Sequence, residues 1–231
     1  MKQRPFALVH ADAGKTNSDA QTRLLGRGIA LIICPQDTGR EGTGYAADLA
    51  KAHNRSLIAL RRRQPCLPAP VMQTEWTVAD MQTVLDRNSD ALLESLERFG
   101  EASEFEVMAP VAPIREKGPS SGTEYLRAKA RTVQAVRRTR QQLETAASAL
   151  MADRNSAIID HRLIGTSTLD ETARLRIWCH QSAASIVHTK LNAMAVELGV
   201  GFRVSGPWLP YGAWPAHLWK RTGKTDDKHA A

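Results

Sequence analysis

The sequence predicts an α+β protein made of two small α/β-sandwich-like domains. Runs with a period of two alternate along the 231 residues with longer runs of helical period, and no apolar run approaches the roughly 20 residues that span a bilayer. A stretch rich in proline, glycine and serine near the middle separates two such sets of elements. We therefore place an N-terminal domain at residues 1–112, a linker at 113–121, a C-terminal α+β domain at 122–215 and a flexible tail at 216–231.

The N-terminal half predicts a small sheet with helices on one of its faces. Residues 28–34 form an apolar run, as expected of a fully buried strand. Thr77 with Asp80 three residues later is the pattern of a helix N-cap, and Gly100 stops the same helix. The other elements expected here are strands at 6–10 and around Phe105 and Val107, a helix at 45–60 and an extended segment at about 64–73.

The C-terminal half contains the longest predicted helix, from residue 123 to residue 152. Its apolar side chains recur at steps of three, four or seven and form a narrow stripe, which suits one arm of a helical hairpin or a short coiled coil. A second helix is expected at 182–198, where Gly199 has the position of a C-cap. The remaining predicted strands lie at Ile158–Ile159, at residues 175–179 and around Phe202 and Val204.

The segment Ser205-Gly206-Pro207-Trp208-Leu209-Pro210-Tyr211 follows the last predicted strand. Gly206 permits a backbone that other residues avoid, and Pro207 and Pro210 each fix φ and lack an N–H donor. We therefore expect a rigid loop that ends the sheet. Two roles are open for its aromatic side chains. In the first, which we adopt, Trp208 is buried in the core and Tyr211 contacts a partner. In the second, Trp208 and Tyr211 together form an exposed anchor for a partner.

The charge of +7 calls for either an acidic partner or a purely solvated surface. Basic residues concentrate at 61–63 and between Arg127 and Arg140, where Tyr125 is the one nearby aromatic residue. Nucleic-acid modules usually combine such charge with stacking aromatics. We therefore favour a solvated helix surface, and predict no specific nucleic acid and no membrane as partners.

Candidate catalytic groups are few and poorly arranged. Gly14-Lys15-Thr16 follows the first strand, but the first glycine of a phosphate-binding loop would fall at Val9, inside that strand. Asp160-His161 and Cys179-His180 could supply an acid, a base and a nucleophile, yet alternation places Cys179 on the apolar face of its strand. His10 and Asp12 lack a third metal ligand. We predict no catalytic, cofactor-binding or metal-binding residues and no cofactor.

The three cysteines, Cys34, Cys66 and Cys179, are odd in number and far apart in the chain. No pair has the spacing of zinc ligands. Buried thiols in a reducing cytoplasm explain this pattern better than a framework of disulfides.

Four motifs, taken in order, resemble the gas vesicle proteins of the GvpF/GvpL family. Leu67-Pro68 is similar to the family's Leu-Pro strand, residues 104–107 to its Glu-aromatic-x-Val strand, and residues 121–126 to its Gly-x-x-Tyr-Leu helix entry. The closing motif Gly206, Pro207, Trp208, Pro210 and Tyr211 resembles the family's Gly-Pro-Trp-Pro-Pro-Tyr. This chain departs from the family pattern at Leu209 and at residues 69–71.

The resemblance implies a ferredoxin-like N-terminal domain, an α+β C-terminal domain with long helices, and a non-catalytic role in building the gas vesicle shell. It implies the gas vesicle shell subunit and other gas vesicle accessory proteins as partners, and a location at the gas vesicle in the cytoplasm. The closing motif is the candidate interaction site. A basic nucleic-acid-binding module using the 127–140 helix and a small hydrolase remain as alternatives.

Overall fold

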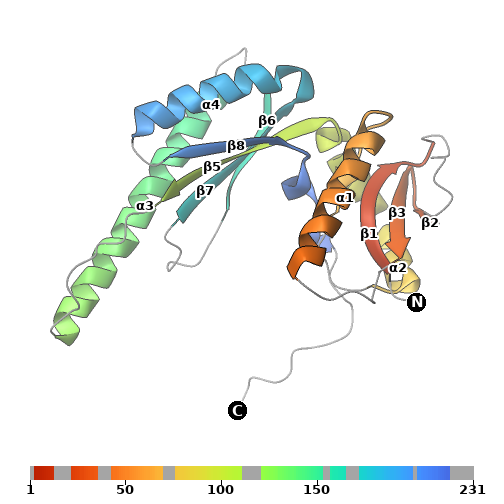
Figure 1. Cartoon of the computed structure of the whole chain (residues 1–231), viewed down its shortest axis with the longest axis horizontal. Coiled ribbons are helices and arrows are strands. Elements are labelled where there is room, and N and C mark those ends of the chain that lie inside the picture. The colour runs from red at the N-terminus through yellow and green to blue at the C-terminus, as the bar shows by residue number, and fades with distance from the viewer. Residues whose placement is uncertain are drawn as a thin grey trace. The chain divides into compact units, whose positions relative to one another are not determined.

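The computed structural model describes residues 3–12, 22–35, 43–69, 76–110, 121–152, 157–164, 172–199 and 202–218 (Figure 1). The chain divides into two compact units, the first made of residues 1–101 together with 209–231, and the second of residues 102–208. Each unit contains one four-stranded sheet with helices. The α+β class expected from the sequence is therefore confirmed.

The first unit has an antiparallel sheet in the order β2-β3-β1-β4. Its elements are β1 (Gln3–His10), β2 (Thr22–Leu25), β3 (Ile29–Pro35), α1 (Thr43–Arg61), β4 (Leu67–Pro68) and α2 (Val78–Phe99). A ferredoxin-like domain has the order β-α-β-β-α-β, whereas the described elements run β-β-β-α-β-α, and residues 13–21 lie outside the described part. β2 is a strand that the sequence analysis did not predict.

Helices pack on both faces of this first sheet, so the expectation of helices on one face is wrong. The register pairs Val9 with Ala30, and these two residues share an apolar cluster with Leu57 of α1. Leu8 and Leu31 form the adjacent pair and point to the opposite face, where α2 packs along the sheet with its own buried side chains. All four strand residues are fully buried. Burial on both faces explains the apolar run of β3.

The start and end of α2 agree with the sequence. The Thr77 hydroxyl oxygen accepts a hydrogen bond from the backbone N–H of Asp80 at 3.1 Å, which satisfies one of the helix's unpaired donors. At the other end, the N–H of Gly100 donates to the carbonyl of Leu96. These local hydrogen bonds depend only on neighbouring residues, which is why the sequence pattern located them.

The second unit has an antiparallel sheet in the order β6-β7-β5-β8. Phe105, Val107, Leu175 and Ile177 alternate along two paired strands and form one apolar face, which α3 and α4 cover. The elements are β5 (Ala102–Pro110), α3 (Gly122–Ala152), β6 (Ile158–Ile164), β7 (Thr172–His180), α4 (Ala184–Leu198) and β8 (Arg203–Trp208).

The division between the units differs from the predicted domain boundaries. β5 pairs along its length with β7 and also with β8, so it belongs to the second sheet and not to the N-terminal domain that was placed at residues 1–112. The predicted linker falls between β5 and α3, both in the second unit, and its residues 113–120 lie outside the described part. Of the predicted tail, residues 216–218 form a short 3-10 helix and residues 219–231 lie outside the described part.

The long helix α3 projects beyond the sheet at its N-terminal end (Figure 1). Its buried residues are Val136, near the middle of the helix, and Leu143 and Ala147, in its C-terminal half. Leu126, in the N-terminal half, is 65% exposed. The helix therefore packs on the second unit with about half of its length.

We predict that Leu143→Ala destabilises the protein far more than Leu126→Ala. Leu143 is fully buried in the core of the second unit, and deleting such a side chain costs about 2–5 kcal/mol of unfolding free energy. Leu126 is exposed, so its truncation should change that free energy by about 0.5 kcal/mol or less. Urea denaturation followed by circular dichroism measures both, and equal losses would contradict the projecting position of Leu126.

Candidate functional site

The closing segment, residues 205–211, was expected to end the second sheet. Its first residues instead continue the sheet as part of β8. β8 runs on through Gly206 and Pro207 to Trp208, which pairs with Glu104 of β5. The peptide bond between Gly206 and Pro207 is cis, and the register shifts between Glu104 and Glu106. β8 is an edge strand, where proline and irregular pairing are tolerated because one side of the strand needs no ladder hydrogen bonds.

Gly206 is required by its surroundings as well as by its backbone. Its φ of +123° lies in the region that side chains rarely adopt. A Cβ atom at this position would stand 2.7 Å from the backbone oxygen of Glu104 and 2.7 Å from the Phe105 ring. A side chain here would therefore push β8 away from β5.

The side chain of Trp208 is exposed, so the expectation that it seats in the core is wrong. Its exposed fraction is 54%, and the neighbouring Pro207 is also exposed. The tryptophan thus lies at the end of an edge strand whose backbone is fixed by a proline. This is the arrangement that the second interpretation of the motif, an exposed anchor, expects for Trp208.

The residues after Trp208 belong to the first unit and are anchored there. Leu209 and Tyr211 pack against the apolar cluster that contains Phe6 and Leu57, and Pro210 is buried. The Tyr211 hydroxyl donates a hydrogen bond to Oδ1 of Asn54 in α1 at 3.2 Å. The structure therefore reverses the predicted roles: Tyr211 serves packing in the first unit, and Trp208 is the accessible aromatic side chain.

The second sheet carries charged side chains on the face opposite its apolar core. Glu104 is buried, and its two carboxylate oxygens have partners: Nε1–H of Trp178 donates to one at 3.0 Å, and Nε of Arg176 lies 2.9 Å from the other. The Arg162 guanidinium lies 5.6 Å from the Trp178 ring, in cation–π geometry. A buried carboxylate needs such partners to offset its desolvation.

This charged cluster was not predicted, although the sequence contains a pattern that indicates it. Glu104 and Glu106 flank Phe105 in β5, and Arg174 and Arg176 alternate with the apolar residues of β7. Arg176 also contacts Glu106 at 3.6 Å, and Arg174 contacts Glu106 at 3.7 Å. Opposite charges at alternate positions of two strands indicate cross-strand pairs. Because both oxygens of Glu104 are engaged, the cluster is a structural one.

The candidate nucleophile Cys179 lies in the apolar core, as the alternation of its strand predicts. Burial raises the pKa of its thiol to about 11, so the reactive thiolate is scarce at neutral pH. His180 is exposed. Asp160 accepts a hydrogen bond from the backbone N–H of His161, and the imidazole Nδ1 of His161 lies 2.8 Å from the sulfur of Met151. These four residues do not form a nucleophile with its base.

The other candidate groups do not assemble a site in the described part of the chain. Gly14-Lys15-Thr16 lies outside the described residues. Among those that are described, no group of three or more metal-ligating side chains occurs, and no helix is long and apolar enough to cross a bilayer. A hollow of about 40 Å³ between α3, β6 and α4, lined mainly by apolar side chains such as Leu150 and Ile158, has room for water but not for a cofactor.

The fold is that of an α+β protein of two units. Its surface presents Trp208 at the end of an edge strand, and the buried carboxylate of Glu104 in the second sheet is paired. A family model described as "Gas vesicle synthesis protein GvpL/GvpF" matches residues 6–212. This chain therefore belongs to the GvpL/GvpF family of gas vesicle synthesis proteins, which confirms the resemblance seen in the sequence.

Two solved structures resemble the fold. The gas vesicle protein GvpF from Microcystis aeruginosa has a TM-score of 0.59 and 8% sequence identity, over 91% of this chain and 97% of that one. GvpF from Anabaena sp. PCC7120 has a TM-score of 0.59 and 8% identity, over 97% of this chain and 98% of that one. At this identity the likeness shows the fold alone. No curated protein sequence matches the chain.

We predict that Tyr211→Phe destabilises the protein while Trp208→Ala does not. The first change removes the hydroxyl bonded to Asn54 and should cost about 0.5–1.5 kcal/mol. The second truncates an exposed side chain and should change the unfolding free energy by about 0.5 kcal/mol or less. Thermal and urea melts measure both. A loss of several kcal/mol in Trp208→Ala would show that the indole is buried after all.

We also predict that Cys66 and Cys179 react slowly with iodoacetamide until the protein unfolds. Burial raises the pKa of each thiol from 9.0 to about 11, which leaves roughly a hundredfold less thiolate at neutral pH. Because these pKa values are raised in the folded state, the buried protonated thiols contribute to the free energy of unfolding in full below pH 9. This contribution is lost as the pH rises towards 11. Peptide mapping by mass spectrometry, with and without urea, checks this; rapid labelling of either thiol in the native protein would contradict it.

Proposed function

We propose that this chain is a non-enzymatic assembly factor or minor structural component of the gas vesicle. It acts in the cytoplasm and at the vesicle through direct contact with the shell subunit, alongside other gas vesicle accessory proteins. Membership of a gas vesicle synthesis family supports the process. The observation that supports contact as the mode of action is the exposed Trp208 at the end of β8.

The position of Trp208 suits a binding anchor for physical reasons. Tryptophan is enriched among the residues that contribute most to protein interfaces, because it buries a large area at little cost in side-chain entropy. The backbone around it is fixed by Pro207 on one side and by buried Pro210 and anchored Tyr211 on the other. A partner therefore meets an indole whose backbone is already ordered, which lowers the entropic cost of binding.

No specific observation favours the alternatives. A hydrolase would need an activated nucleophile, and the thiol of Cys179 is buried and protonated. A nucleic-acid module on α3 would need stacking side chains beside its basic residues, and Tyr125 is the one aromatic residue in the helix. The proposed function therefore rests on contact with protein.

We predict that Trp208→Ala weakens binding to the shell subunit by about 30-fold or more, equivalent to about 2 kcal/mol, with unchanged melting. The measurement is co-purification of the shell subunit with this chain, followed by titration of the two folded proteins. Leu25→Ala is the matched control, because Leu25 is a similarly exposed apolar residue of β2, at 60%.

Three results would count against this proposal. Failure of the wild-type chain to associate with the shell subunit at micromolar concentrations would remove the direct contact. Equal binding by the Trp208→Ala and wild-type proteins would keep the contact but move it away from the closing segment. Deletion of the gene should reduce or abolish vesicles, so normal buoyant vesicles in a deletion strain would exclude an essential role in assembly.

A further inference from the structure

The projecting part of α3, residues 122–135, presents an apolar face to the exterior. Leu126, Ala130 and Val133 follow one another at steps of four and three, so they lie on the same side of the helix. Leu126 is 65% exposed, Ala130 is exposed and Val133 is half-buried. The buried part of the helix begins at Val136, three residues further on. An apolar face thus continues past the region where α3 packs on its own unit.

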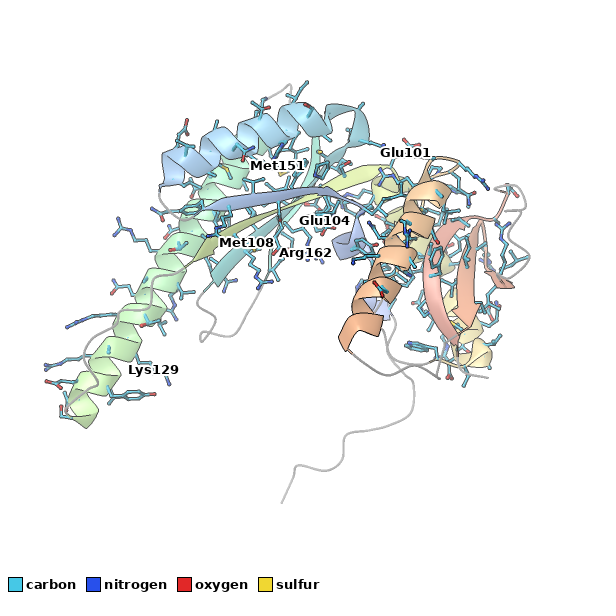
Figure 2. The ribbon with its side chains drawn as sticks, viewed as in Figure 1. Glu101, Glu104, Met108, Lys129, Met151 and Arg162 are labelled. Atoms are coloured by element: carbon cyan, nitrogen blue, oxygen red, sulfur yellow. The ribbon has the colours of Figure 1, made fainter. Side chains whose placement is uncertain are left out.

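The apolar face is hollowed and bordered by cations. The hollow is lined by Leu126, Lys129, Ala130, Val133, Gln134 and Arg137. Lys129 and Arg137 are exposed, and Lys129 lies on the projecting part of the helix in Figure 2. Between residues 122 and 140 the sequence has six basic residues and one acidic residue, Glu124. The surface is therefore apolar along its centre and positive at its margins.

The charge decides which kind of partner fits. Two copies of α3 placed side by side would bring like charges together, which is unfavourable at an interface. Nucleic acid would contact the cations but would leave the apolar centre uncovered, and Tyr125 is the one aromatic residue here that could stack on a base. An amphipathic helix with acidic margins matches both features, because its apolar side chains at i, i+3, i+4 and i+7 fill the hollow.

We propose that residues 122–137 of α3 form a docking surface for an acidic amphipathic helix of a partner protein. Leu126, Ala130 and Val133 contact the apolar face of that helix, and Lys129 and Arg137 pair with its carboxylates. This is a second interaction surface, separate in sequence from Trp208, and it goes beyond the proposed contact with the shell subunit. It gives the basic charge of the helix a role in recognition.

The test uses two synthetic amphipathic peptides of about 21 residues, long enough to form helix on binding. Both carry leucine along one face; one has glutamate at the flanking positions and the other has lysine. Fluorescence anisotropy with the full chain should show binding of the glutamate peptide alone, weakening with salt. Leu126→Asp should weaken it at least tenfold, and Lys129→Glu with Arg137→Glu should switch the preference to the lysine peptide.

Val196→Asp is the matched control, because Val196 is an 80% exposed apolar residue of α4 in the same unit. It should bind the glutamate peptide as the wild type does. Circular dichroism should show that all variants are folded, because each changed side chain is exposed.

Four outcomes would overturn the docking surface. They are absence of binding to the glutamate peptide, equal binding of both peptides, self-association that Leu126→Asp abolishes in sedimentation experiments, and a nanomolar complex of α3 with DNA or RNA at physiological salt. The result is independent of the shell subunit. The expected peptide pattern without co-purification of the shell subunit supports this surface and counts against the proposed contact at Trp208.

Discussion

The buried carboxylate of Glu104 is the constraint on which the second unit depends. Trp178 of β7 donates a hydrogen bond to one of its oxygens, and Arg176 of β7 forms an ion pair with the other. Its backbone pairs with Trp208 of β8 and approaches Gly206 too closely for any side chain there. An unpaired buried carboxylate would cost several kcal/mol, and a one-residue slip of β7 would move both partners to the apolar face. The register of β7 against β5 therefore depends on the Glu104 side chain, and the path of β8 depends on its close approach to the Glu104 backbone.

The parts of this structure that depend on neighbouring residues could be predicted from the sequence. The Thr77 cap, the stop at Gly100 and the alternation that buries Cys179 are set by local hydrogen bonds or by strand period. The apolar stripe of α3 predicted the length of the helix. It did not predict how much of the stripe is buried. Exposure of Leu126 depends on where the sheet ends, and no local pattern contains that information.

The parts that failed depend on pairings between distant residues. β5 was assigned to the first domain because a proline-rich stretch follows it, yet its partners lie about 70 and 100 residues away, in β7 and β8. β8 was expected to stop at its prolines because a central strand would stop there; as an edge strand it does not. The surroundings of Trp208 and Tyr211 were predicted the wrong way round, because the sequence of a short proline-containing segment does not tell which of its aromatic side chains the fold covers.

The edge position of β8 also determines how a partner can bind there. An exposed strand edge invites another chain to add a strand through backbone hydrogen bonds, and proline on the edge is one of the devices that prevents it. Pro207 supplies no N–H, and the register shift opposite it interrupts the ladder. A partner that bound at this edge would therefore have to use side chains, and Trp208 is the exposed large hydrophobic residue of β8. The prolines that made the segment look like the end of a sheet thus hinder strand addition at this edge and leave the exposed indole of Trp208 beside it.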